Sequence, residues 1–309
     1  MVRKKRSTQL LHEYFSEWVE LYKEGAVRTI TLDKYYMSAH WLEKLAPKIK
    51  LFELDRRTYQ QILNNYALSH EKQTTMDFHH QLKGALLDAV DEGLIPTNPT
   101  RKIIIKGKAP SEKKPKFINQ FEVQRLLKEL NLTSEISWDW FILLIAKTGI
   151  RFSEALAVTP DDFDFTNQKL SINKTWNYRN SKGYFQPTKN ESSNRKIHLD
   201  WQIAMQFSQL IKGKKSDEPI FINGRVFNST INYYLKKICL KAQVPVISIH
   251  SLRHTHASLL LFAGVSIASV AQRLGHSSIS TTQETYIHII QELEHQDTEK
   301  IMRHLATLI

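Results

Sequence analysis

Hydrophobic residues in the first ninety positions recur with the period of an α-helix. Apolar side chains three to four positions apart predict four helices, at about residues 10–22, 31–45, 58–69 and 74–92. Gly25, Pro47 and Gly93 interrupt these patterns, as turn-forming residues do. The first part of the chain is therefore expected to be entirely helical.

The hydrophobic pattern becomes mixed after Phe117. Helices are predicted at about residues 119–130 and 137–147, and polar and apolar residues then alternate at 169–176, as in a half-buried strand. Further strand candidates lie at 184–187 and 195–199, and helical patterns return from Asn228, with helices at 251–262, 267–274 and 281–290. The predicted fold class is mainly α with a small antiparallel sheet (α+β).

A basic segment separates these two patterns. Pro96 and Pro99 precede residues 101–116, which hold seven lysines or arginines and one acid, Glu112. Such a composition is typical of an interdomain linker. A chain of 309 residues accommodates two domains, so we predict a helical domain at 1–100, a linker at 101–116 and a second domain at 117–309.

Charge and composition narrow the function classes. The chain carries a formal charge of +12, which favours a polyanionic partner such as nucleic acid. Residues 7–100 hold ten basic and thirteen acidic side chains, so DNA contact there requires a local face. Cys239 is the one cysteine, which excludes an internal disulfide. Neither a membrane-spanning run nor an apolar signal core is present, so a cytoplasmic protein without a membrane partner is expected.

Four short segments, followed by a tyrosine, carry the chemistry. Arg151 and Arg253 have the planar, permanently charged fork that binds two oxygens of a phosphodiester. His250 lies three residues before Arg253, so both side chains share one helix face and can converge on one phosphate. The segments are TGIRFSEAL at 148–156, TK at 188–189, HSLRHT at 250–255 and LGH at 274–276, with Tyr286 ten residues after the last histidine.

In order and approximate spacing, this set resembles the tyrosine recombinase, or phage integrase, family. The spacing of Tyr286 is similar to that of phage and conjugative-transposon integrases. The resemblance covers the second half of the chain throughout. The helical first half more weakly resembles the family's core-binding, SAM-like domain, and the two domains are expected to form a C-shaped clamp on DNA.

The resemblance implies a role for each residue. Tyr286 would attack phosphorus and form a 3′-phosphotyrosyl bond, while Lys189 would protonate the departing 5′ oxygen; Lys182 is the possible substitute for that lysine. His250 and His276 would assist proton transfer and bind phosphate oxygens. Glu154 would hold Arg151 in place without contacting the phosphate itself. Because the covalent link keeps the energy of the broken bond, the reaction would need no nucleotide triphosphate. It would need no metal or other cofactor either, since cationic side chains neutralise the charge.

The resemblance also implies partners. These are double-stranded DNA attachment sites, a homo-tetramer assembled on paired sites, and an accessory DNA-bending or directionality protein. The linker would bind phosphates, with an ordinary solubilising linker as the alternative. An apolar stripe, Ile301, Leu305 and Leu308, predicts a tail helix that docks on a neighbouring protomer or on its own domain. The linker residues proposed for DNA contact are Lys102, Lys106, Lys108, Lys113 and Lys114.

One alternative concerns the histidines, and two concern the function of the protein. His250, His254 and His256 suggest a metal site, but neither Glu nor Cys stands nearby to complete the ligands. A non-catalytic DNA-binding regulator of the same fold would have no use for a nucleophile beside a phosphate-binding cradle. A type IB topoisomerase shares the chemistry without exchanging strands. Many phage integrases also carry an arm-binding domain ahead of the core-binding domain, and the sequence leaves its presence open.

Overall fold

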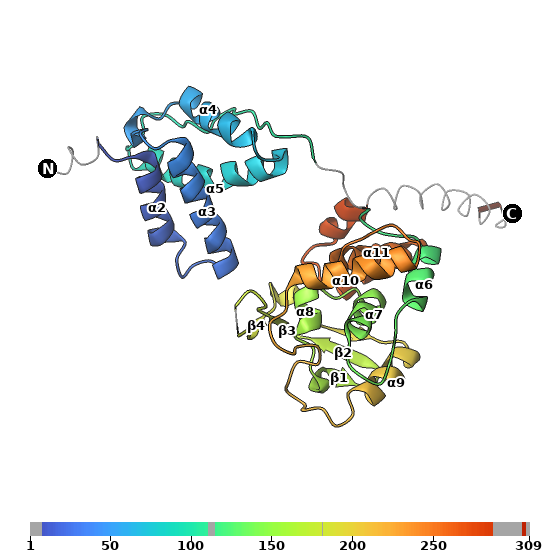
Figure 1. The fold of residues 1–309 in the computed structure, drawn as a ribbon. Helices are drawn as coiled ribbons and strands as arrows, with labels where there is room; N and C mark the ends of the chain where they lie inside the picture. The colour runs from blue at the N-terminus through green and yellow to red at the C-terminus, as the bar shows by residue number, and fades with distance from the viewer. Residues whose placement is uncertain (1–7, 111–114, 181, 287–304, 307–309) are drawn as a thin grey trace. The chain divides into compact units, whose positions relative to one another are not determined.

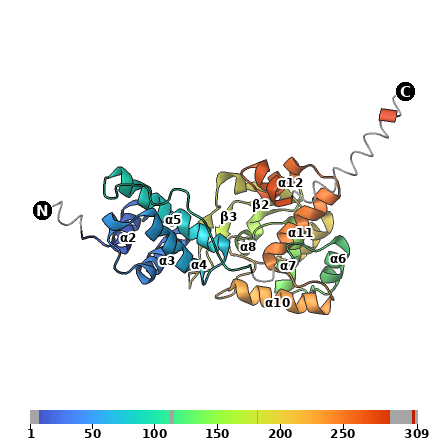
Figure 2. The same ribbon diagram turned by 90° about the horizontal axis from the view of Figure 1, so that it is seen from above.

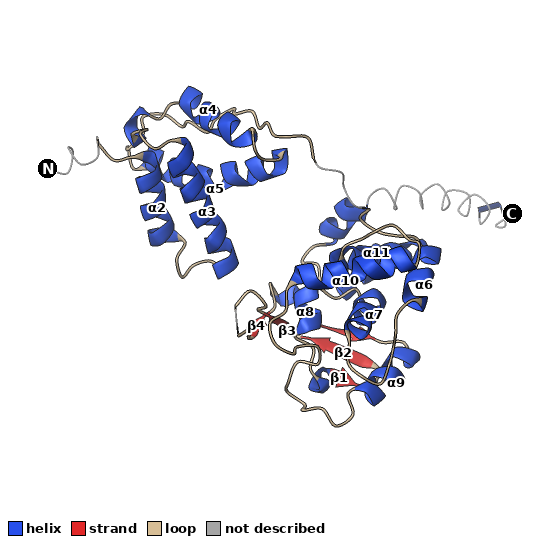
Figure 3. Ribbon diagram, in the orientation of Figure 1, coloured by secondary structure: helices blue, strands red, loops and turns tan. Residues whose placement is uncertain are grey.

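The computed structural model describes residues 8–110, 115–180, 182–286 and 305–306. The chain divides into two units, Met1–Glu112 and Lys113–Ile309. The first is helical, and the second combines helices with short strands (Figure 3). The predicted fold class, mainly α with a small antiparallel component, is confirmed.

The helices of the first unit lie where the hydrophobic spacing predicts them (Figure 1). Its described residues form α2 (Leu11–Tyr22), α3 (Thr29–Leu45), α4 (Arg56–Ala67) and α5 (Lys72–Asp91), with a short 3₁₀ turn, η1 (Leu51–Glu53), before α4. Asp55 caps α4, because its side chain accepts a hydrogen bond from the Thr58 backbone at 2.7 Å. Each helix directs its apolar stripe to a shared core.

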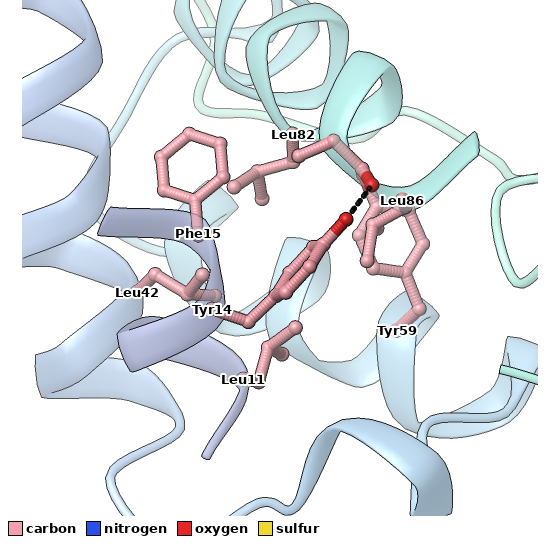
Figure 4. Close-up of a pocket in the computed structure, with 8 residues that line it drawn as sticks. Leu11, Tyr14, Phe15, Leu42, Tyr59, Leu82 and Leu86 are labelled. Carbon is pink, nitrogen blue, oxygen red and sulfur yellow. Dashed lines mark hydrogen bonds between the residues drawn. The ribbon is translucent and has the colours of Figure 1, made fainter. Parts of the chain in front are cut away.

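Aromatic residues fix α2 against α5 in that core. Figure 4 shows Tyr14 among the apolar side chains, with its hydroxyl donating to the carbonyl of Ala85 at 3.1 Å. One turn later, Trp18 donates its indole N–H to Asp88 at 2.7 Å. A buried aromatic with a polar end requires such a partner. These two bonds therefore set how α2 and α5 align.

The segment after Thr100 runs along the first unit as a strap, residues 103–108. The backbone N–H of Ile104 donates to Gln60 of α4, and the Gln60 amide donates back to the Ile104 carbonyl, both at 2.8 Å. The N–H of Lys108 donates to the carbonyl of His70 at 2.8 Å. Of the lysines predicted to bind DNA, Lys102, Lys106 and Lys108 lie on or beside this strap, and Lys113 and Lys114 lie outside the described residues.

The second unit packs helices against its short strands (Figures 1 and 2). Its helices are α6 (Gln120–Lys128), α7 (Trp138–Thr148), α8 (Phe152–Leu156), α9 (Trp201–Leu210), α10 (Asn228–Lys241), α11 (Ile249–Phe262) and α12 (Ile267–Leu274), followed by a helical stretch at 279–286. Its strands are β1 (Phe163–Asp164), β2 (Lys169–Ile172), β3 (Lys174–Trp176), β4 (Phe185–Pro187) and β5 (Arg195–His198). Two short 3₁₀ turns are η2 (Pro160–Asp162) and η3 (Glu191–Ser193).

The strands form two antiparallel sheets where one was predicted. One sheet has the order β1-β2-β5, and the other pairs β3 with β4. The single strand expected at 169–176 is wrong, because β2 ends at Ile172 and β3 begins at Lys174. Ile172 pairs with Arg195, the first residue of β5, so β5 offers no partner beyond that point. The chain pairs there with β4 instead.

Two helices, α8 and α9, were not predicted. Helix α9 begins after Asp200, whose side chain accepts from the Ile203 backbone at 3.0 Å. Ile203, Phe207 and Leu210 are buried at helical spacing. The cap and the stripe are thus both readable in the sequence.

Helix α7 forms the centre of the second unit and packs against α11. Most of its residues are buried, which suits a helix enclosed by other elements. None of the described helices is long and apolar enough to cross a membrane. In the predicted tail, Leu305 is exposed, while Ile301 and Leu308 lie outside the described residues.

Candidate active site

Two left-handed glycines bring distant segments to the start of α11. Gly149 ends α7 with φ of 69°, and Gly275 ends α12 with φ of 68°. A Cβ on Gly149 would lie 2.6 Å from the His256 ring, and one on Gly275 would lie 2.9 Å from Arg195. Both the backbone conformation and the close approach therefore require glycine.

Arg151 lies directly before α8 and is held by three segments. Its Nη1 donates to Glu154 at 2.7 Å and to the Ser193 hydroxyl at 3.4 Å, and its Nη2 donates to the carbonyl of Gly275 at 2.9 Å. The side chain keeps 27% exposure, so the guanidinium is partly accessible to solvent. It is therefore fixed in position and still open to a ligand.

The carboxylate of Glu154 binds both Arg151 and Arg195. Arg195 was not predicted from the sequence as a site residue. Arg195 donates from Nη2 to the carboxylate at 2.9 Å and from Nε to the carbonyl of Arg273 at 2.7 Å. Burial would raise the pKa of Glu154, but the charges of Arg195 and Arg151 outweigh burial and lower it. Arg195 begins a strand and is unmarked in the sequence, so only the folded arrangement reveals its contact.

Arg253 lies one turn into α11 and is buried, with 4% exposure. Its Nη1 donates to the carbonyl of Gly149 at 2.8 Å and its Nη2 to that of Leu274 at 2.7 Å. Burial, then the charge of Arg151, lowers its pKa. Those two bonds use two of the five N–H donors of the guanidinium, and they link the ends of α7 and α12.

His250 and His276 lie within the field of both arginines. Burial, followed by Arg253 and Arg151, lowers the pKa of His250. The same causes, with Arg195 and His254 after them, lower the pKa of His276 to about 4. The ring of His276 is oriented by Thr282, whose hydroxyl lies 2.7 Å from Nδ1. In the free protein at neutral pH, His276 is therefore uncharged.

Tyr286 ends the described helical stretch 279–286 and is 2% exposed. It packs with a small apolar cluster that includes Leu261 and Leu274. Its hydroxyl lies 2.9 Å from Nδ1 of His254, a second residue that sequence reasoning did not place in the site. Burial raises the pKa of Tyr286 to about 12, against a lowering by Arg253.

His256 and Arg273 form a hydrogen-bonded pair next to the arginine cluster. Arg273 donates from Nε to Nε2 of His256 at 2.9 Å, and from its Nη atoms to the carbonyls of His198 and Lys147. The other ring nitrogen of His256 lies 3.0 Å from the carbonyl of Ala146. Since Nε2 accepts, Nδ1 carries the proton and donates. This link ties α7, α11, α12 and the end of β5 together.

Lys189 lies in the turn after β4, where it is exposed. The turn itself is ordered, since Thr188 donates to Asn194 at 2.8 Å and Ser193 donates to the Asn190 side chain at 2.5 Å. Ser193 also accepts from Arg151. The turn that carries Lys189 is thus tied to the arginine cluster, although no contact of the Lys189 side chain with that cluster is observed among the described residues. Lys182 lies in the neighbouring turn and is also exposed.

The histidines suggested as metal ligands have other partners. His254 faces Tyr286, and both ring nitrogens of His256 are hydrogen-bonded. Across the described ranges, no group of three or more His, Cys, Asp or Glu side chains could hold a metal ion.

The arrangement provides a cationic cradle beside a phenol. The arginine forks are held by carbonyls and one carboxylate, and they need little reorganisation to meet oxygen atoms that gain negative charge. The structure brings together Arg151, Glu154, His250, Arg253, His276 and Tyr286.

Comparison with known proteins places this geometry in context. Residues 116–292 match the phage integrase family. The integrase of Staphylococcus phage L54a is 23% identical over 336 residues, covering 95% of this chain and 93% of that protein. A tyrosine recombinase XerC-like protein of Caldanaerobacter subterraneus subsp. tengcongensis is 26% identical over 301 residues, covering 88% of this chain and 70% of that protein.

Solved structures show the same fold. The Tn1549 transposon integrase in complex with transposon right end DNA aligns with a TM-score of 0.76 at 18% identity, covering 95% of this chain and 100% of that one. A lambda integrase dimer bound to a core site aligns with a TM-score of 0.66 at 16% identity, covering 91% of this chain and 78% of that one.

Proposed function

The chain belongs to the phage integrase family, and on that premise we propose that it breaks and rejoins DNA through a 3′-phosphotyrosyl bond to Tyr286. It is a site-specific DNA recombinase of the kind that integrates and excises mobile elements. The observation that carries the proposal is that the Tyr286 hydroxyl lies 2.9 Å from His254, the residue that follows the buried Arg253 on α11.

In the proposed reaction, the Tyr286 oxygen forms a bond to phosphorus and the bond from phosphorus to the 5′ oxygen breaks. Lys189 gives a proton to the departing 5′ oxygen, and His250 and His276 assist the transfer of the tyrosyl proton. Arg151 and Arg253 stabilise the charge that develops on the non-bridging oxygens. Rejoining is the reverse, with a 5′ hydroxyl as the attacking group.

The arriving phosphate changes the histidines of the site. In the free protein, burial and then neighbouring positive charges lower the pKa values of His250 and His276. A phosphodiester adds a negative charge close to both rings and thereby raises their pKa values. DNA itself thus prepares these side chains for proton transfer.

Double-stranded DNA is the proposed substrate, with two domains closing on it as a clamp. Phosphates would be contacted by the side chains of Lys102, Lys106 and Lys108, which lie on or beside the strap. The side chains of Lys113 and Lys114 would extend this contact. A lambda integrase tetramer bound to a Holliday junction aligns with a TM-score of 0.63 at 17% identity. We extend that assembly to a homo-tetramer of this chain on paired sites, in which the tail joins neighbouring protomers. The protein would act in the cytoplasm of a bacterium, together with an accessory DNA-bending or directionality protein.

Nicked duplexes made from the ends of the mobile element that encodes the protein test this function. A recombinase forms a covalent adduct on them and exchanges strands between two paired duplexes. Relaxation of supercoiled DNA with an adduct but without exchange would identify a type IB topoisomerase. Binding without any adduct would identify a DNA-binding regulator, and either result would overturn the proposal.

A further inference from the structure

His254 stands beside Tyr286 without a role in the reaction proposed above. It follows Arg253 directly on α11, and its Nδ1 lies 2.9 Å from the tyrosine hydroxyl. The rings of the two residues are tilted against each other, with centroids 5.8 Å apart. On its other side, the ring of His254 meets that of His250 edge-on at 4.9 Å.

The hydroxyl of Tyr286 depends on this contact. The residue is 2% exposed, and Ala257, Leu261, Val270 and Leu274 belong to the same apolar cluster. A buried hydroxyl without a partner costs about 1–3 kcal/mol. His254 is the polar side chain that the described residues place at hydrogen-bond distance from it.

In this position the Tyr286 hydroxyl is engaged by His254, and the residue is 2% exposed. Attack on DNA therefore requires Tyr286 to leave its position, and the bond to His254 must break when it does. We propose that His254 is a positioning residue that holds the Tyr286 hydroxyl in a resting, DNA-free position, and that release of this bond precedes attack. The inference rests on the proposed function for the identity of the nucleophile.

Protonation states agree with holding rather than activation. Burial, followed by the charges of His250, Arg253 and Lys116, lowers the pKa of His254 to about 4. The pKa of Tyr286 is raised to about 12, chiefly by burial. Because the pKa of the phenol lies far above that of the imidazole, the proton stays on the phenol. In this arrangement His254 accepts a hydrogen bond from Tyr286 but does not remove its proton.

The test compares a substitution that removes the hydrogen-bond acceptor with one that keeps an acceptor. His254→Phe keeps an aromatic ring and removes both ring nitrogens, including Nδ1. His254→Asn places an amide near the position of Nδ1, so it keeps a hydrogen-bonding partner for the phenol. His80→Phe, an exposed histidine on α5, serves as the control for the loss of a histidine. Thermal unfolding, monitored by circular dichroism, verifies that each variant is folded. If His254→Phe is not folded, His254→Ala replaces it.

The first readout is the reactivity of Tyr286 in the protein without DNA. N-acetylimidazole acetylates accessible tyrosines, and mass spectrometry of the tryptic peptide reports Tyr286 alone. We expect acetylation to be about fivefold faster in His254→Phe, the ratio for loss of one ordinary hydrogen bond. His254→Asn and His80→Phe should react as the unmodified protein does. Equal rates in all four proteins, or equal acceleration in both His254 variants, would overturn the proposal.

The second readout is single-turnover adduct formation at saturating nicked DNA. If His254 only holds the resting state, His254→Phe forms adduct at least as fast as the unmodified protein. A tenfold slower rate would mean that His254 acts in the chemical step, which overturns the holding role. Failure of the proposed function looks different, because Tyr286→Phe would then still form adduct whatever the acetylation result.

Discussion

Replacing Glu154 by glutamine is expected to damage both stability and cleavage. The carboxylate of Glu154 is 1% exposed and meets Nη1 of Arg151 at 2.7 Å and Nη2 of Arg195 at 2.9 Å. The substitution Glu154→Gln preserves shape and removes the negative charge. Arg151 and Arg195 would then face each other without compensation, and Arg151 would lose its main anchor.

The size of the effect follows from burial. Breaking a buried ion pair by removing one partner costs about 3–5 kcal/mol. Arg195 is 6% exposed and takes this cost almost fully, whereas Arg151, at 27%, is partly screened by water. Glutamine keeps one acceptor oxygen. We therefore expect a loss of about 3 kcal/mol in the free energy of unfolding, the low end of that range.

Urea unfolding and single-turnover cleavage separate the two effects. Asp162→Asn is the matched control, because Asp162 is a buried carboxylate of the same unit that binds Lys174 at 2.6 Å. Both variants should lose stability. Under conditions where both remain folded, only Glu154→Gln should cleave slowly, by about 10²- to 10³-fold if Arg151 no longer meets the phosphate. Cleavage at the unmodified rate would refute the view that Glu154 places Arg151.

Three further predictions concern other parts of the chain. Lys189→Ala should cleave ordinary DNA about 10²- to 10⁴-fold more slowly but regain its rate when sulfur replaces the 5′ bridging oxygen, since a thiolate leaves without an acid; absence of rescue would move the proton donor to Lys182 or His250. Acidification from pH 8 to 5 should lower the free energy of unfolding by about 2 kcal/mol through His256 alone, because in this pH range only the unfolded form, with the ordinary pKa, takes up a proton. Urea unfolding measures this loss. Burial lowers the pKa of His256 to about 3 in the folded protein, so this loss begins near pH 6.5, and a flat profile would contradict it. Glutamine at the linker lysines should flatten the salt dependence of DNA binding by about 0.9 for each phosphate that the protein no longer neutralises, and an unchanged slope would leave the linker as a spacer; the residues are Lys102, Lys106, Lys108, Lys113 and Lys114.

Local pattern was sufficient for most helices because each buries a stripe that its own spacing reveals. It failed for the sheets, where the alternation at 169–176 continues through Asn173 but the pairing partner changes. That break depends on where β5 begins, more than twenty residues later. Helix α9 was missed although Asp200 and its apolar stripe mark it.

The candidate site divides in the same way. Residues in recognisable motifs, such as Arg151 and Arg253, could be named from the sequence. Arg195 and His254 could not, because the role of each depends on a contact made across the fold. His254 does carry a local signal, four residues after His250, but that spacing suggested only a metal site, which lacked further ligands. Only the position of Tyr286 in the structure distinguishes a metal ligand from a hydrogen-bonding partner of the tyrosine.

The central claim is that Tyr286 is the nucleophile, and the adduct itself tests it most directly. The protein is trapped on a nicked duplex, the DNA is digested to a short residue, and the tryptic peptides are sequenced by mass spectrometry. We predict a nucleotide joined through its 3′ phosphate to Tyr286, and none in Tyr286→Phe, which should still bind DNA. A nucleotide on any other residue, or an adduct that survives in Tyr286→Phe, would contradict the account.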